Sequence, residues 1–268
     1  MKKTVLTVLA IAALISVVAG CKKKSAQDDS LNALIARGEF VLGLDDSFPP
    51  LGFRDDNNEI VGYDIDLATE VAKRLGVNFR AQPISWDAKE QELATGNIDC
   101  IWNGLTITPE RLEALSFTKP YLDNEQAVVV TQASGYTTLA ELAGKTIGLQ
   151  AGSSAADAVE ASPEFKASLN SITEFKDNVT ALNDLEIGGV DGVVMDSVVA
   201  NYVIKTTGKP FTIIHDTLAS EQYGVAFRKG DVKLSEKVQA VLEEMEADGT
   251  VAELSRKWFG ANISVIGK

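Results

Sequence analysis

The segment Phe40-Val41-Leu42-Gly43-Leu44 is a short apolar run whose length and flanking residues predict a β-strand. Residues 64–75 follow it with Leu67, Val71 and Leu75 on one helical face, which predicts a helix that Asp64 caps. The same alternation continues along the chain. Further strands are predicted at 77–81, 98–102, 126–131, 146–149, 171–175, 190–194 and 223–228, and further helices at 87–95, 153–160, 177–187, 196–206, 231–247 and 250–258. Another helix is predicted to begin at Pro109, with Thr108 as its N-cap. Strands that alternate with helices indicate parallel sheets in α/β layers.

The N-terminal residues read as a targeting signal. Lys2 and Lys3 precede an apolar run at residues 4–18, and small residues lead directly to Cys21. This end is similar to the lipobox of bacterial lipoproteins, which implies cleavage before Cys21 and diacylation of its sulfur. The alternative is an uncleaved membrane helix with an incidental cysteine. We therefore expect a signal peptide at residues 1–20 and a lipidated tether at 21–37.

Composition excludes several classes of protein. The 268 residues are 45% hydrophobic and 24% charged, which is typical of globular domains rather than disordered chains. With 38 acidic against 25 basic residues, the formal charge of −13 argues against a nucleic-acid partner. A single histidine, His215, and two cysteines exclude a multi-histidine metal site and a thiolate zinc cluster. We expect neither a metal nor a cofactor, and Cys100, in an apolar run, is expected to be a buried core residue.

Two candidate sites follow predicted strands of the first half of the chain. Asp45, at the end of the first strand, can meet a cationic group, and Phe48 offers a flat apolar face. After the strand at 98–102, the segment Asn103-Gly104-Leu105-Thr106 supplies amide and hydroxyl donors. Arg111, in the first turn of the next helix, brings a planar fork suited to a carboxylate. The structural alternatives are a capping turn for Asp45 and an exposed surface arginine for Arg111.

Two more candidates lie in the second half. Ser154 opens a helix after a strand, and Asp157 stands at the spacing of a capping box, so simple capping is the alternative to anion binding. Asp196 follows the apolar run at 190–195, where it can pair with an ammonium group or cap the next helix. The four candidate sites contain two acids, an arginine and a helix start suited to anions. Together they imply a ligand that carries both a carboxylate and an ammonium group, which describes an α-amino acid.

The chain resembles the polar-amino-acid-binding proteins of bacterial ABC importers, in the periplasmic binding protein type 2 class, from about residue 38 to 260. The resemblance rests on the order and spacing of six segments. They are Gly43 to Pro50, Gly62-Tyr63-Asp64-Ile65-Asp66-Leu67, Leu93-Ala94-Thr95-Gly96-Asn97-Ile98-Asp99, Thr106 to Arg111, Ser116-Phe117-Thr118-Lys119-Pro120-Tyr121, and Tyr223-Gly224-Val225-Ala226-Phe227-Arg228-Lys229-Gly230.

This resemblance implies a two-lobed α/β fold with two crossover strands as a hinge. Residues 38–125 and 220–268 would form one lobe, and residues 126–219 the other. It implies no catalytic residue and no enzyme activity. The partners would be an amino acid, the membrane permease subunits of the importer and the lipid anchor at Cys21, and we expect a monomer on the extracytoplasmic face of the membrane.

The resemblance also implies a role for each candidate residue. Arg111 would clamp the α-carboxylate, helped by Thr106, Gly104 and Ser154. Asp196 and the Asn103 carbonyl would take the α-ammonium, and Asp45 would approach the ammonium or a polar side chain. Phe48 and Trp86 would sandwich the ligand side chain.

The sequence leaves the ligand open among basic amino acids, glutamine-like amino acids and cystine. Asn103 stands where many relatives carry serine, and Phe48 where tyrosine is common. Two other functions are weighed. Some dehydratases share this fold, but the amino-acid clamp uses the obvious carboxylates and His215 has no visible nucleophile partner. A lipoprotein that presents its ligand to a signalling protein is the other alternative.

Overall fold

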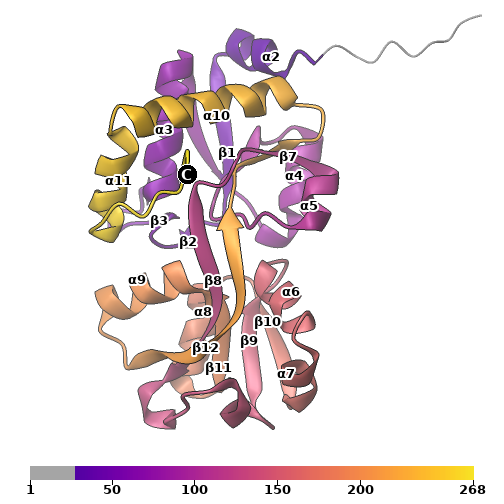
Figure 1. Cartoon of the computed structure of the whole chain (residues 1–268), viewed down its shortest axis with the longest axis vertical. Helices are drawn as coiled ribbons and strands as arrows, with labels where there is room; N and C mark the ends of the chain where they lie inside the picture. Colours follow the sequence, from indigo (N-terminus) through magenta and orange to yellow (C-terminus); the bar gives the residue numbers. More distant parts are fainter. Residues whose placement is uncertain (1–27) are drawn as a thin grey trace, which may run out of the picture.

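The computed structural model describes residues 28–268; the predicted signal peptide and the predicted lipidation site, Cys21, lie outside the described residues. The described part forms two lobes, one above the other in Figure 1. Each lobe contains one five-stranded sheet, in the order β5-β1-β6-β13-β7 in lobe 1 and β10-β9-β11-β8-β12 in lobe 2. Among these residues no helix has the length and apolar character needed to cross a membrane.

The strands of lobe 1 are β1 (Glu39–Leu44), β5 (Asn78–Pro83), β6 (Cys100–Ile101), β7 (Leu115–Phe117) and β13 (Ala226–Arg228), with a small sheet of β2 (Ser47–Phe48), β3 (Gly52–Arg54) and β4 (Ile60–Val61). Its helices are α2 (Ser30–Arg37), α3 (Tyr63–Leu75), η1 (Trp86–Ala88), α4 (Lys89–Thr95), α5 (Pro109–Ala114), α10 (Val232–Ala247) and α11 (Thr250–Phe259).

Lobe 2 contains the strands β8 (Leu122–Thr131), β9 (Thr146–Gln150), β10 (Ser171–Phe175), β11 (Gly192–Asp196) and β12 (Phe211–Tyr223). Its helices are η2 (Gln132–Ser134), η3 (Leu139–Leu142), α6 (Ser154–Glu160), α7 (Pro163–Ser168), α8 (Asn178–Ile187) and α9 (Ser197–Thr207).

The sheets are mixed, whereas the sequence pattern predicted parallel ones. In lobe 1, β5, β1 and β6 are parallel, and β13 is antiparallel to β6 and β7. In lobe 2, β10, β9 and β11 are parallel, and β8 and β12 add antiparallel pairs. The reason is topological. The parallel strands end where the lobes meet, whereas β8 enters lobe 2 from lobe 1, and β13 follows the return crossing, so both run away from the junction.

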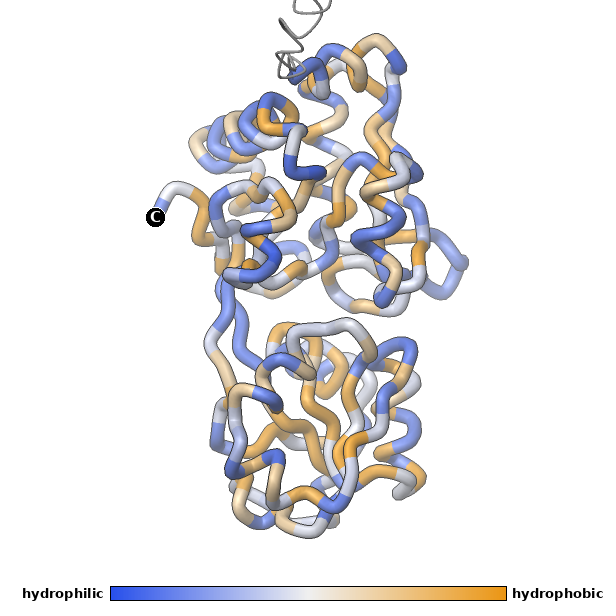
Figure 2. Tube along the Cα trace, turned by 90° about the vertical axis from the view of Figure 1, so that its right-hand side faces the viewer, coloured by the Kyte–Doolittle hydropathy of each residue, from blue (hydrophilic) through white to orange (hydrophobic). Residues whose placement is uncertain are grey.

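The chain crosses between the lobes in the first half of β8 and the second half of β12. These halves pair antiparallel from Leu122↔Tyr223 to Gln126↔Ala219. We call residues 122–126 and 219–223 the hinge segments. Figure 2 shows hydrophobic residues inside each lobe, whereas the segments that join the lobes are hydrophilic. The hinge therefore brings polar side chains to the place where the two lobes meet.

The tether predicted over residues 21–37 is shorter in the structure. Residues 30–37 form helix α2, which packs against α10 through the buried Leu34 and a hydrogen bond from the Leu234 N–H to Ser30 Oγ, 3.2 Å long. Leu31, Leu34 and Ile35 follow the helical spacing of three and four residues, and Gly38 ends the helix in the left-handed conformation. This apolar face stabilises the segment on lobe 1.

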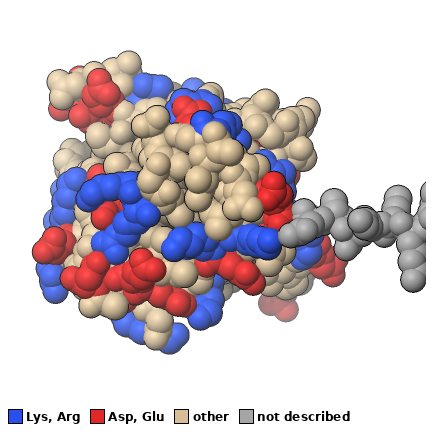
Figure 3. All heavy atoms as spheres, turned by 90° about the horizontal axis from the view of Figure 1, so that it is seen from above, with Lys and Arg blue, Asp and Glu red and all other residues tan. Residues whose placement is uncertain are grey.

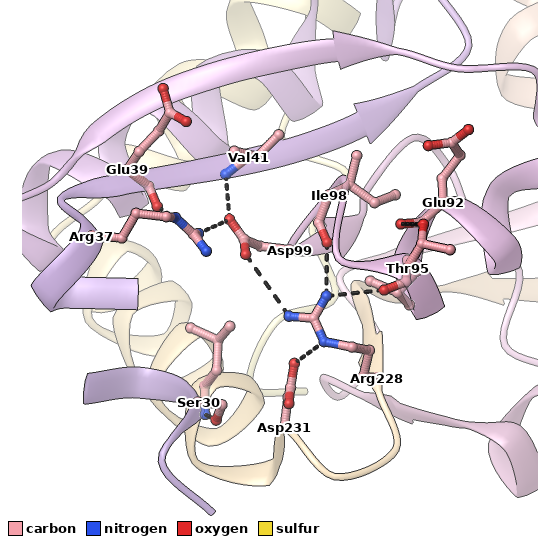
Figure 4. Close-up of polar contacts among 12 residues, drawn as sticks. Ser30, Arg37, Glu39, Val41, Glu92, Thr95, Ile98, Asp99, Arg228 and Asp231 are labelled. Carbon is pink, nitrogen blue, oxygen red and sulfur yellow. Dashed lines mark hydrogen bonds and ion pairs between the residues drawn. The ribbon is translucent and has the colours of Figure 1, made fainter. Parts of the chain in front are cut away.

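A buried carboxylate ties this end of lobe 1 together. Asp99, 3% exposed, accepts a 2.8 Å hydrogen bond from the Val41 N–H and pairs with the guanidinium of Arg37. The Arg228 guanidinium lies 3.8 Å away on the other side and also donates to the carbonyls of Leu93 and Ile98 (Figure 4). One carboxylate thus links α2, β1 and β13. On the face of lobe 1 in Figure 3, acidic and basic side chains are interleaved.

We predict that Asp99→Ala lowers the free energy of unfolding by about 2–4 kcal/mol, because the Val41 N–H loses its side-chain acceptor and two guanidinium groups lose their shared anion. Urea denaturation followed by circular dichroism measures this. Glu39→Ala is the control, since it removes an exposed ion pair between Arg80 and β1, the strand that contains Val41, and should cost less than about 1 kcal/mol. Equal losses for the two variants would contradict the proposed importance of Asp99.

Candidate interlobe binding site

The candidate residues lie where the carboxyl ends of parallel strands in the two sheets face each other. β1 and β6 of lobe 1 lead into Asp45 and Asn103, and β9 and β11 of lobe 2 end at Gln150 and Asp196. Ligands of open α/β sheets bind beyond such strand ends. Because the hinge segments hold two of these edges face to face, side chains from both lobes meet in one place.

Seven of the nine predicted site residues line a single small cavity between the lobes. Its lining consists of Phe48, Trp86, Gly104, Thr106, Arg111, Gln150, Ser153, Ser154 and Asp196. The other two predicted residues lie beside it. Asp45 accepts a 2.7 Å hydrogen bond from Gln150 Nε2, and the Asn103 Oδ1 accepts one of 3.0 Å from the Asp45 N–H. Gln150 and Ser153 complete the lining; they belong to the stretch around Ser154 but were not predicted as ligand contacts.

Arg111 lies on lobe 1, in the first turn of α5. Thr108 caps this helix by accepting a hydrogen bond from the Arg111 N–H. The guanidinium Nη1 donates to the Thr106 carbonyl at 2.9 Å, and no carboxylate of the described residues lies within 4 Å of it. Arg111 thus lines the cavity with a cationic group that has no anionic partner in this part of the chain.

The lobes contact each other at three polar points around the cavity. The Thr106 and Ser154 hydroxyls are 3.0 Å apart, and Gln150 Nε2 donates to Asp45. The buried Lys89 of lobe 1 donates at 2.8 Å to the carbonyl of Gly152 in lobe 2. Ser154 was predicted to be either a cap or a ligand contact; in the structure Ser153 is the N-cap residue, and the Ser154 hydroxyl faces Thr106.

Asp196 lies on lobe 2 and is 5% exposed. Its Oδ1 accepts hydrogen bonds from Asn124 Nδ2 at 2.6 Å, Gln126 Nε2 at 3.1 Å and the Tyr223 hydroxyl at 2.6 Å. Burial, together with the nearby carboxylate of Glu221, raises the pKa of Asp196 to about 7. The side chain does not cap α9, which was the structural alternative for this residue.

Asp45, on lobe 1, is the second acid at the cavity and is 7% exposed. Its hydrogen-bond donors are the Gln150 amide and the Ser47 N–H. Burial raises the pKa of Asp45 to about 6, since these two hydrogen bonds only partly replace water around the carboxylate. A cationic ligand group would supply what the two neutral donors do not.

Phe48 and Trp86 form the apolar part of the lining, and both are buried. Gly104 lies between this part and the hydroxyl groups, with a φ of +61°. A Cβ at this position would lie 2.7 Å from Leu51 and 2.8 Å from Phe48, so both the backbone conformation and the space require glycine.

Asp64 holds the backbone of the site in place although it does not line the cavity. We predicted it as a helix cap, but α3 begins at Tyr63, and Asp64 is fully buried. Its Oδ2 accepts 2.9 Å hydrogen bonds from the Gly104 N–H and the Tyr121 hydroxyl. Burial raises the pKa of Asp64 to about 7, and the two hydrogen bonds oppose that shift. Asp64 therefore fixes the turn at Gly104 rather than the start of the helix.

The chain belongs to the bacterial extracellular solute-binding proteins, family 3, whose family model matches residues 40–261. It is 30% identical over 253 residues to the L-cystine-binding protein TcyJ of Escherichia coli K12, covering 93% of this chain and 94% of that protein. It is 33% identical over 224 residues to the ABC transporter arginine-binding protein 1 of the same organism, covering 81% and 89%. A substrate-binding protein of a Streptococcus pneumoniae ABC uptake transporter, solved with bound histidine, aligns with a TM-score of 0.87 at 36% identity, covering 90% of this chain and 100% of that one. The two-lobed α/β fold inferred from the resemblance is confirmed by the structure and its neighbours.

We predict that Asp196→Asn gains stability relative to the wild type as the pH rises from 5 to 8. The carboxyl has a pKa of about 7 in the folded chain and an ordinary pKa of 3.8. The unfolded chain therefore releases this proton first, and the wild type loses about 2–3 kcal/mol of stability between pH 5 and pH 8, most of it below the folded-state pKa. Asparagine cannot titrate and removes this loss.

Urea denaturation of ligand-free protein at pH 5 and pH 8 measures the effect. Asp123→Asn is the control for the loss of one negative charge, since Asp123 lies on the neighbouring strand β8 with its side chain exposed. A difference between wild type and Asp196→Asn that is the same at both pH values would contradict the raised pKa.

Proposed function

We propose that the chain is the extracytoplasmic solute-binding component of an ABC importer, which captures a polar L-amino acid between its lobes and delivers it to membrane permease subunits. One observation carries the proposal. The Arg111 guanidinium of lobe 1 and the Asp196 carboxylate of lobe 2 line the same cavity, and neither has a partner of opposite charge within 4 Å among residues 28–268. An α-amino acid carries the two complementary charges on one carbon atom.

In this proposal Arg111 binds the α-carboxylate, with hydrogen bonds from the hydroxyls of Thr106 and Ser154. Gly104 lines the site without donating to the ligand, because its N–H is hydrogen-bonded to Asp64. Asp196 binds the α-ammonium group, and the Asn103 carbonyl adds an acceptor. These groups come from both lobes, so an amino acid makes all of its contacts only when the lobes are together. Binding therefore favours the state with the lobes in contact, which is the state that an importer can distinguish from the free protein.

The remaining predicted residues surround the ligand side chain. Phe48 and Trp86 supply the flat apolar surfaces on either side of it, and Asp45 supplies a polar end. The family supports this arrangement, since the relatives named above include binding proteins for cystine, arginine and histidine.

We predict that Arg111→Ala weakens amino-acid binding by about 2–5 kcal/mol, because the α-carboxylate would be left buried without its cation. A thermal-shift screen of the ligand-stripped chain against all amino acids and cystine identifies the ligand, since a ligand that binds the folded state raises the melting temperature. Isothermal titration calorimetry then compares the wild type with the variant.

Arg80→Ala is the matched control, because Arg80 is an exposed arginine of lobe 1 that pairs with Glu39 and does not line the cavity. Arg80→Ala should bind as the wild type does. Retained affinity in Arg111→Ala would remove Arg111 from the site. Chemical conversion of a bound candidate, detected by mass spectrometry, would favour the dehydratase alternative, and a ligand-dependent complex with a signalling receptor in place of a permease would favour the sensor.

We propose in addition that lipid at Cys21 holds the mature chain on the extracytoplasmic face of the membrane. The support is the sequence itself, in which basic residues, a short apolar run and small residues precede Cys21. A lipid anchor keeps the binding protein close to the permease and raises its local concentration there.

We predict that Cys21→Ser moves the protein from the membrane fraction to the soluble fraction, because the sulfur that would carry the diacylglyceryl group is missing. Cell fractionation with immunoblotting measures the distribution. Cys100→Ser is the control and should remain with the membranes, since this second cysteine is buried in lobe 1. Unchanged membrane association of Cys21→Ser would mean that the apolar segment itself is the anchor.

A further inference from the structure

A carboxylate from the hinge reaches the interlobe site. Glu221, in the hinge segment of β12, accepts hydrogen bonds at its Oε2 from Asn124 Nδ2, Gln126 Nε2 and Thr106 Oγ1, each 3.0 Å long, and from Ser154 Oγ at 3.3 Å. These donors come from lobe 1, from lobe 2 and from the opposite hinge segment. All four are neutral, and no lysine or arginine nitrogen of the described chain lies within 4 Å of this carboxylate.

Glu221 and Asp196 form a carboxylate pair. The Asn124 amide nitrogen donates to both acids, at 2.6 Å to Asp196 Oδ1 and 3.0 Å to Glu221 Oε2. The Gln126 amide nitrogen does the same at 3.1 and 3.0 Å. Two shared amides therefore hold two carboxylate oxygens next to each other. Asp196 is buried and Glu221 is partly buried, so water screens the repulsion between these like charges less than it would at the surface.

Gln126 provides a further acceptor at this pair. Its side chain is fully buried, and its Oε1 has no hydrogen-bond partner among the described residues. A buried amide oxygen without a donor costs free energy, and an ammonium group has three donors to distribute. Two carboxylate oxygens and an amide oxygen are therefore the surroundings that suit a cationic group.

The charges around the cavity do not balance for a neutral amino acid. Asp45, Asp196 and Glu221 bring three carboxylates, and Arg111 brings one cation. Lys89, the other buried cation nearby, does not reach these acids, because its ammonium group donates to the carbonyls of Trp86 and Gly152 and lies 3.3 Å from Glu90. A zwitterion adds one charge of each sign and leaves the excess unchanged, whereas a cationic side chain reduces it.

We infer that the site selects an amino acid with a cationic side chain, and that Glu221 forms with Asp196 the receptor for its α-ammonium group, which leaves Asp45 for the side-chain cation. This inference rests on the proposed function and narrows its ligand from polar amino acids to cationic ones. The Asp45 carboxylate follows β1 of lobe 1 and is held by Gln150, whereas Asp196 ends β11 of lobe 2, so the two acids come from opposite lobes.

L-arginine and L-citrulline test the inference, because they have nearly the same shape and differ in the charge of the side chain. Calorimetric titration of the full, ligand-stripped chain should show arginine bound at least about 30-fold more tightly than citrulline, the ratio expected when a buried charge loses its partner. Glu221→Gln should weaken arginine binding by at least about tenfold, since it removes one charge from the ammonium receptor.

Glu125→Gln is the matched control. Glu125 lies on the paired hinge segment opposite Ser220, but its side chain is exposed, so the same charge change should leave arginine affinity unchanged. The alternative role for Glu221 is to occupy the Thr106 and Ser154 hydroxyls in place of a ligand carboxylate. In that case Glu221→Gln would bind arginine as tightly as the wild type or more tightly, and the inference would be wrong.

The outcomes also separate this inference from the proposed function. If citrulline, glutamine or cystine binds as tightly as arginine, the selection for a cationic side chain is overturned while amino-acid capture stands. If no amino acid binds, the proposed function itself fails. The wild-type ratio of arginine to citrulline affinity decides the charge selection even if Glu221→Gln does not fold.

Discussion

Antiparallel pairing between the hinge segments of β8 and β12 determines the geometry of everything else in the molecule. It joins two sheets that are otherwise separate and brings the carboxyl ends of β1 and β6 opposite those of β9 and β11. Side chains that follow parallel strands in either lobe therefore converge without any long loop. The pairing also sets which hinge residues face inward. Asn124, Gln126, Glu221 and Tyr223 point to the junction, and the residues between them are exposed.

Most of the helices and strands, and many of the residues at the site, could be predicted because the apolar pattern of the sequence indicates where each strand ends. The helices and strands follow the apolar spacing, and Asp45, Arg111, Ser154 and Asp196 each come directly after a predicted strand or at the start of a helix, where α/β folds place their ligand contacts. Gln150 carries the same signal, since it ends the strand before the turn at Gly152, and the strand-end rule applies to it equally well. Glycine at position 104 follows from its backbone conformation only once the turn is known.

The contribution of the hinge residues to the site could not be predicted, because it depends on the register between β8 and β12. Side chains alternate faces along a strand, so a shift of one residue between β8 and β12 would turn Glu221 outward and Gln222 inward. The observed register is interrupted between Ile213 and Thr217 and again between Thr217 and Ala219, and no local pattern in the sequence indicates those irregularities. Asp64 shows a related limit, since its capping position in the sequence does not reveal that burial against Gly104 and Tyr121 takes precedence.

A few attractive contacts between the lobes are opposed by repulsion among the acids at the site. This balance explains how a ligand can shift the population toward the state with the lobes in contact. Apart from the rings of Phe53 and Tyr202, whose centroids are 6.0 Å apart, the direct links are three polar contacts. They are a hydroxyl pair at Thr106 and Ser154, an amide-to-carboxylate hydrogen bond at Asp45 and an ammonium-to-carbonyl hydrogen bond at Lys89. Each such bond contributes about 1 kcal/mol, or somewhat more where a charged group takes part. Contact between the lobes also covers Asp45 and sets lobe 1 against Asp196 and Glu221, which the β8 amides of Asn124 and Gln126 hold beside each other, and this excess of negative charge opposes contact at neutral pH. A ligand that supplies the missing positive charge removes this opposition in the state with the lobes together and has no comparable effect when they are apart. Such a difference in interaction free energy between two states is what allows a ligand to shift a population.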